Sequence, residues 1–126
     1  MGSIERLLII EEVRLDREQL RVLVENMGPA AADDLVSQSM ERLTELLQRT
    51  GKNYRNSNFA AMEPSLRAII GLSRQVGMTL LARVAKDTLE LCASNDVIAL
   101  GATVARLERI GENSLVAMWN MQDLSV

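Results

Sequence analysis

One short segment, residues 67–77, combines residue types and a spacing that could do chemistry. Its sequence is RAIIGLSRQVG, which places Gly71 in the interior of an expected helix, four residues after Arg67 and three before Arg74. Glycine in place of alanine inside a helix costs about 1 kcal/mol, so a partner that must approach the backbone would explain its presence. Residues three and four apart share one helix face, so this face is bare at its centre and basic at its edges.

The residue inventory excludes several common chemistries. The chain has no histidine and a single cysteine, which rules out a Ser-His-Asp triad, a Cys-His dyad, a His-Cys zinc site and a disulfide framework. The cysteine, Cys92, is expected to be a small, unreactive side chain near the inner side of its helix. Neighbouring acids such as Glu11-Glu12 point in different directions on a helix and are poorly placed for acid-base work. We therefore expect no enzyme activity, no metal and no cofactor.

Size and charge narrow the class of protein and partner. The 126 residues are 48% apolar and 25% charged, values typical of one soluble globular domain. The net charge of -3 argues against a nucleic-acid binder, which needs clustered basic residues. No apolar run reaches the roughly 18 to 20 residues of a membrane helix. Because a lone cysteine favours a reducing compartment, we expect a cytoplasmic protein.

The elements that position residues 67–77 are predicted to be helices. Aromatic residues make up only 2% of the chain, which disfavours strands and favours an all-α fold. Asp16 predicts a helix N-cap, with the Gln19 side chain reaching back to it, and Gly28-Pro29 predicts where that helix stops. The apolar stripe of this first helix is expected at Leu20, Leu23, Val24 and Met27.

Four further helices are expected after Pro29. Their predicted boundary residues are Gly51 as the end of the second helix, Asn58 as a cap before the third, Gly77 as its end, Thr79 as the cap of the fourth, and Val97 through Trp119 for the fifth. Pro64 either kinks the third helix or delays its start. Short connections force neighbouring helices to lie antiparallel, so we predict an up-down-up-down four-helix bundle over residues 15–126, with the first helix as a lid.

An apolar segment, residues 1–14, precedes this bundle. It is apolar on more than one face of a helix, through Ile4, Leu7, Leu8, Ile9, Ile10 and Val13. Another surface must therefore cover it. One interpretation is an additional helix packed on its own bundle. The other is a homodimer contact made by Leu7, Leu8, Ile9 and Ile10.

The ordered spacing of these features resembles the histidine-containing phosphotransfer (HPt) domain. The family pattern is His-x-Leu-Lys-Gly, then a serine, then a glycine that closes the helix, and it is matched here by Ile69, Gly71, Ser73 and Gly77. The resemblance spans roughly Leu15 to Trp119 and includes the Leu-Asp start of the first helix, the break at Gly28, Asn58-Phe59 and Asp96. It implies a four-helix bundle that presents the histidine to the acidic phosphorylation pocket of a receiver domain, with the glycine letting that pocket come close.

Two departures from the family pattern change the function that the resemblance implies. Arg67 stands at the position of the phosphoacceptor histidine, and Ile70 at that of the lysine. A guanidinium stays protonated and is a poor nucleophile, so this chain is not expected to carry a phosphoryl group in the family's way. Arg67 and Arg74 can still offer bidentate hydrogen bonds to carboxylates or to a phosphoryl group. Gly71 would keep the approach clear, and Ile70 would add an apolar contact.

The resemblance therefore implies a non-catalytic pseudo-phosphotransfer protein. Its expected partner is a response-regulator receiver domain or a histidine kinase of a two-component phosphorelay, bound through Arg67, Ile70, Gly71 and Arg74. The alternative is a structural helical-bundle module, a homodimer or an adaptor, that has lost receiver binding.

Overall fold

The structure is a computed structural model and describes residues 12–124. All regular secondary structure in this part of the chain is helical, in five elements: α2 (Arg17–Met27), α3 (Pro29–Arg55), α4 (Phe59–Gln75), α5 (Thr79–Cys92) and α6 (Val97–Leu124). The predicted all-α class is confirmed. The proposed dimer contact at Leu7, Leu8, Ile9 and Ile10 lies outside the described residues.

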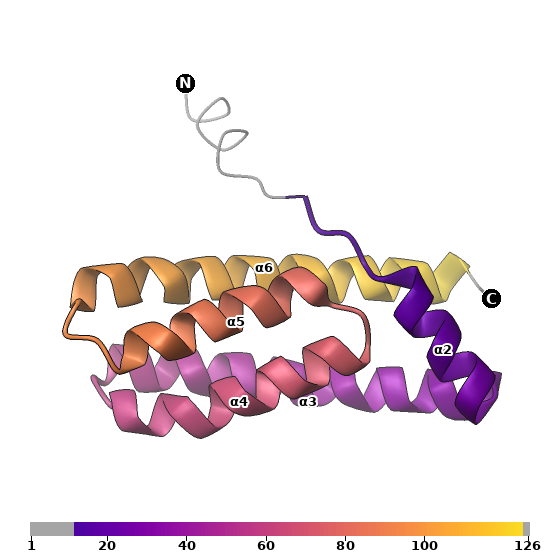
Figure 1. Cartoon of the computed structure of the whole chain (residues 1–126), viewed down its shortest axis with the longest axis horizontal. Coiled ribbons are helices and arrows are strands. Elements are labelled where there is room, and N and C mark those ends of the chain that lie inside the picture. Colours follow the sequence, from indigo (N-terminus) through magenta and orange to yellow (C-terminus); the bar gives the residue numbers. More distant parts are fainter. Residues whose placement is uncertain (1–11, 125–126) are drawn as a thin grey trace.

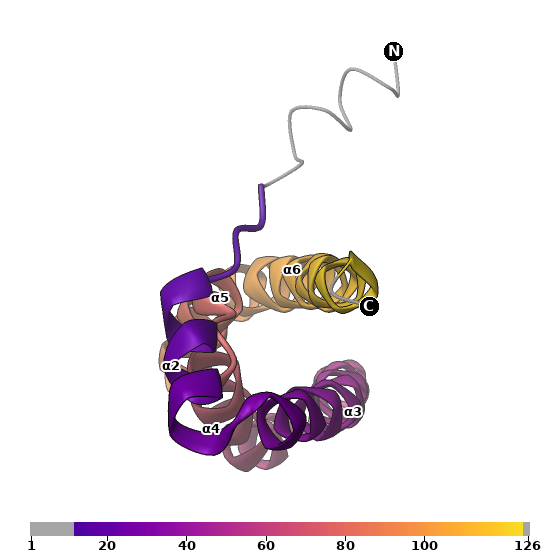
Figure 2. The same ribbon diagram turned by 90° about the vertical axis from the view of Figure 1, so that its right-hand side faces the viewer.

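Four long helices, α3 to α6, lie side by side, and successive ones run in opposite directions along the long axis (Figure 1). Each packs against the next along the chain, and α6 also contacts α3, though less extensively than the other neighbours meet. The shorter α2 crosses one end of the molecule and packs on α3 (Figure 2). The seam between α3 and α6 is therefore the least tightly joined edge of the helical body.

The core between these helices is built from aliphatic and methionine side chains. Burying one such side chain contributes about 1.5–3 kcal/mol, so this interior supplies most of the favourable free energy of folding. The largest fully buried members are Leu43, Leu46, Met62, Leu66, Ile69, Met78, Leu81, Leu107, Ile110 and Met118.

The prediction that Gly51 ends the second helix is wrong. Helix α3 continues to Arg55, and Gly51 is buried within it. A Cβ at this position would lie 2.7 Å from Oε1 of Glu108 on α6. The glycine therefore leaves room for the half-exposed Glu108 side chain of α6 and does not mark a chain turn.

The predicted cap of the fourth helix is also wrong, and the structure decides between the two alternatives for Pro64. Thr79 is the first residue of α5, and Met78 occupies the N-cap position with no side-chain hydrogen bond. Helix α4 begins at Phe59 and runs through Pro64, so the proline does not delay its start. Asn58 does occupy the N-cap position of α4, but its side chain makes no capping hydrogen bond.

The start of α2 is partly as predicted. Oδ1 of Asp16 accepts a hydrogen bond from the backbone N–H of Gln19 at 3.1 Å, as an N-cap should. The Gln19 side chain does not reach back, however, because its Nε2 donates to the carbonyl oxygen of Gln75 on α4 at 3.0 Å. The predicted stripe is only partly covered, since Val24 and Met27 are each 43% exposed. Helix α2 crosses only one end of the molecule (Figure 2), and Leu23 is its buried residue.

Candidate functional site

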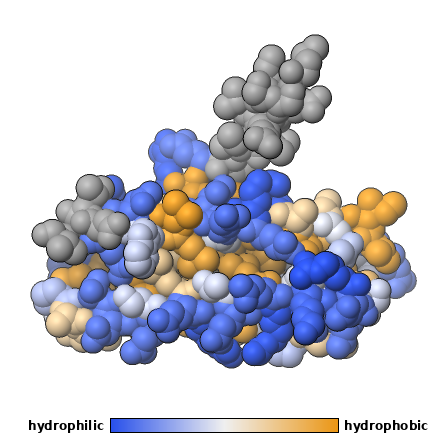
Figure 3. Space-filling view, turned by 180° about the vertical axis from the view of Figure 1, so that it is seen from behind, coloured by the Kyte–Doolittle hydropathy of each residue, from blue (hydrophilic) through white to orange (hydrophobic). Residues whose placement is uncertain are grey.

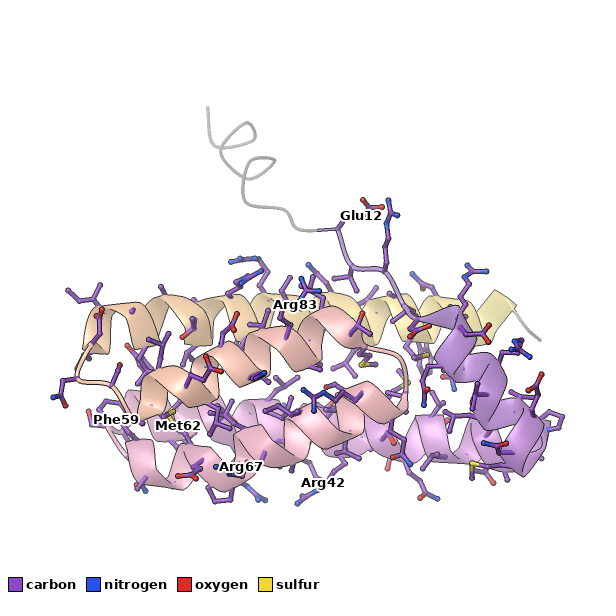
Figure 4. The ribbon with its side chains drawn as sticks, viewed as in Figure 1. Glu12, Arg42, Phe59, Met62, Arg67 and Arg83 are labelled. Atoms are coloured by element: carbon purple, nitrogen blue, oxygen red, sulfur yellow. The ribbon has the colours of Figure 1, made fainter. Side chains whose placement is uncertain are left out.

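The candidate docking surface consists of Arg67, Ile70, Gly71 and Arg74 on the outer side of α4. The opposite side of this helix is anchored in the core by Met62, Leu66 and Ile69, which are completely buried. This division between a buried and an exposed side follows from apolar residues spaced three and four apart. Figure 4 shows Arg67 projecting outward from α4, away from α5 and α6.

The end of α4 next to Arg74 is closed by a double hydrogen-bonded turn. The N–H of Met78 donates to the carbonyl of Ser73 at 2.8 Å, and the N–H of Gly77 donates to the carbonyl of Arg74 at 3.4 Å. Gly77 has φ +80°, a left-handed conformation that glycine adopts without strain. The predicted stop at Gly77 is thus confirmed, and it sets where the exposed helix surface ends.

Arg67 is held by a carboxylate on its own helix. Its Nη2 lies 2.9 Å, and its Nε 3.2 Å, from Oε1 of Glu63, one helical turn earlier. Both side chains are more than half exposed, and such i,i+4 ion pairs contribute only about 0.3–0.5 kcal/mol. The guanidinium of Arg67 can therefore exchange Glu63 for a carboxylate of a partner at little cost.

Gly71 differs from the other five glycines among the described residues. A Cβ at Gly71 would meet nothing within 4 Å, and the position is exposed. The other five have a reason inside the chain: Gly28 and Gly77 adopt positive φ, and a Cβ at Gly51, Gly101 or Gly111 would collide with Glu108, Tyr54 or Leu47, respectively. Nothing within the described residues therefore requires a glycine at position 71.

Two residues near this surface were missed by the sequence analysis. Glu63 could have been found from its i,i+4 spacing to Arg67. Arg42 on α3 projects from the same edge of the molecule as Arg67 (Figure 4) and pairs with Glu45 at 3.1 Å. No spacing rule connects Arg42 to Arg67, because only the packing of α3 against α4 brings their helices together.

Cys92 is half-buried at the end of α5. Burial raises the pKa of the Cys92 thiol, and the nearby negative charge of Glu63 raises it further. A thiolate is the reactive form of cysteine, so these surroundings disfavour nucleophilic chemistry. This agrees with the expectation of an unreactive side chain.

The described part of the chain contains no group of three acidic or cysteine side chains placed to hold a metal ion. Its helices also include none with the length and apolar character needed to cross a membrane. No known protein family, curated protein or solved structure matches the chain.

Proposed function

We propose that this chain is an HPt-like helical bundle that docks on a receiver domain, or on a histidine kinase, without carrying phosphate. The observation that carries the proposal is the exposed mid-helix Gly71, which no contact within the described residues explains. A helix interior normally disfavours glycine by about 1 kcal/mol relative to alanine. Close approach of a partner to the backbone of α4 accounts for that loss of stability.

The side chains around Gly71 suit an acidic partner. Arg67 and Arg74 are exposed on either side of the glycine, and Ile70 is half-buried between the core and the surface. A receiver domain concentrates carboxylates at its phosphorylation pocket, and guanidinium groups bind carboxylates or phosphoryl oxygens in bidentate fashion. Arg67 would leave Glu63 for such a group, while Ile70 would contact an apolar rim.

Arg67 also explains why binding would not lead to phosphoryl transfer. An arginine guanidinium has no free lone pair to attack a phosphoryl group. The proposed protein therefore occupies a receiver and competes with phosphotransfer partners that carry a histidine. The alternating directions of α3 to α6, with α2 across one end, support the bundle part of the proposal.

The test is calorimetric titration of this protein with receiver domains from its own genome, each unmodified and with a phosphoryl mimic. We expect saturable binding to at least one receiver, weakened at least about tenfold by Arg67→Glu because a charge attraction becomes a repulsion. Arg83→Glu is the matched control, since Arg83 projects from α5 on the opposite side of the molecule (Figure 4). It should bind as the unchanged protein does.

A second variant tests the role of Gly71. Gly71→Leu should fold, because the position is open, yet it should lose receiver binding by placing a side chain between the two backbones. If the folded Gly71→Leu protein or the Arg67→Glu protein bound normally, this surface would not be the docking site. If no receiver bound at all, the chain would be a structural module with an idle α4 surface.

A further inference from the structure

A second surface of the molecule is an apolar groove along the seam between α3 and α6. Three adjoining hollows of about 670, 320 and 360 Å³ make up this groove. Leu20, Leu23 and Val24 of α2 also line the first hollow, and the third combines Leu47 and Leu115 with polar residues such as Gln48, Glu108 and Glu112. Trp119 lines the first and second hollows, while Thr44 and Leu115 line the second and third, so the three follow one another along the seam. In Figure 3 the middle of this side carries several apolar patches with hydrophilic residues between them, above a mostly hydrophilic lower margin.

Large apolar side chains stand exposed in this groove. Trp119, the single tryptophan of the chain, is 61% exposed, and Val116 and Val24 are also exposed beside it. Contiguous apolar surface of this kind on a small protein marks an interaction site, because water disfavours its exposure. The groove therefore needs an occupant with apolar side chains.

The chain itself contains such an occupant. Residues 1–11 lie outside the described part and include Ile4, Leu7, Leu8, Ile9 and Ile10. As a helix, residues 4–11 would be about 12 Å long, whereas the stretch of α3 that borders the groove, residues 29–55, is about 40 Å long. A helix with apolar residues on more than one face can contact both walls of such a groove.

The position of Glu12 argues against insertion of the segment into its own groove. The first described residues lie above α5, whereas the seam between α3 and α6 opens on the other side of α6 (Figure 2). Val13 and Leu15 are packed against the core there. A helix is about 10–12 Å wide, so passing around α6 would use three or four extended residues. Those residues would include Ile9 and Ile10, which would then lie outside the groove.

We propose that the groove between α3 and α6 binds the N-terminal segment of a second copy of this chain, so that two copies exchange these segments in a symmetric dimer. Exchange of an identical element is a common route to dimers, because each copy supplies both halves of the contact. The proposed contact leaves the α4 docking surface uncovered and does not depend on the proposed receiver binding.

The first test is sedimentation of the 126-residue chain and three variants of it. The unchanged chain should be a dimer. Ile9→Asp with Ile10→Asp should place two charges among the segment's apolar residues, and Trp119→Glu should place a charge in the groove. Each should raise the dimer dissociation constant at least about tenfold. Ile98→Glu is the control, because Ile98 is an apolar residue of α6 that is 89% exposed and lines none of the three hollows.

The second test mixes the two weakened proteins. The Ile9→Asp, Ile10→Asp protein keeps an intact groove, and the Trp119→Glu protein keeps an intact segment. They should associate with each other more tightly than either does with itself, because one segment-to-groove contact is restored. A monomeric unchanged chain, a dimer that survives either set of substitutions, or a mixture that fails to associate would overturn the proposal.

Discussion

At the scale of single residues, glycine occurs at different positions of this chain for different physical reasons. Gly111 on α6 faces Leu47 on α3, and a Cβ there would lie 2.6 Å from Cδ1 of that leucine. Gly71 faces no atom of the described residues within 4 Å. Gly111 allows α3 and α6 to pack closely. Gly71 lowers the stability of α4, and no contact within the described residues compensates for this loss. This contrast makes Gly71 the stronger functional candidate.

Alanine substitution should separate these two causes. Gly71→Ala should raise the free energy of unfolding by about 0.5–1 kcal/mol, because alanine favours the helix and its Cβ meets nothing. Gly111→Ala should instead lower it, because buried Leu47 would have to move. Urea denaturation followed by circular dichroism measures both values. A loss of stability in Gly71→Ala would mean that internal structure requires this glycine.

The thiol of Cys92 provides a pH-dependent test of the surroundings of Glu63. Burial and Glu63 both raise the pKa of the Cys92 thiol. The thiolate fraction should therefore stay low until the pH is above the pKa of an ordinary cysteine. Alkylation by iodoacetamide should therefore accelerate only at higher pH. Glu63→Gln should shift this profile to lower pH, and Glu90→Gln, elsewhere on the exposed surface of α5, should not. An unchanged profile in Glu63→Gln would exclude the electrostatic contribution.

At the scale of elements, the start of α2 is tied to the connection between α4 and α5. The N–H of Asp16 donates to the carbonyl of Gly77 at 2.8 Å, and Gln19 donates to Gln75 at 3.0 Å. A Cβ at Gly77 would lie 2.7 Å from the carbonyl oxygen of Asp16. The turn that ends α4 is therefore also the anchor of α2.

Loss of the α2 cap should be measurable as loss of stability. Asp16→Ala removes the side-chain acceptor for the N–H of Gln19 and should lower the free energy of unfolding by about 1 kcal/mol. Asp16→Asn keeps an acceptor oxygen and should retain most of that stability. Thermal denaturation of the three proteins makes the comparison. Equal loss in both variants would show that the charge, and not the cap, matters.

At the scale of the whole molecule, the two candidate surfaces differ in chemistry and lie on different sides. The docking surface on α4 is basic, and the groove between α3 and α6 is apolar. The weak joining of α3 to α6 leaves the groove open, while tight packing on both sides of α4 supports the docking surface. One molecule could therefore use both surfaces at once.

Ionic strength should distinguish the two surfaces. Raising salt from about 0.05 M to 0.5 M shortens the screening length severalfold, so receiver binding through Arg67 and Arg74 should weaken markedly. Burial of apolar side chains is not screened, so the dimer should persist unchanged or tighten. Calorimetry and sedimentation at the two salt concentrations measure these outcomes. Receiver binding that is insensitive to salt would exclude a contact dominated by the arginines.

The sequence by itself determined the helical class and most helix boundaries, because caps and breaks act locally. Asp16, Gly28-Pro29 and Gly77 were correctly identified, since each needs only neighbouring residues to begin or end a helix. The prediction for Gly51 was wrong because a Cβ there would meet Glu108, which is far away in the chain and close only after folding. The shared edge of Arg42 and Arg67 and the groove beside Trp119 likewise exist only through packing of separate helices. Tertiary structure alone decided these surfaces, because each is made by side chains that no local spacing connects.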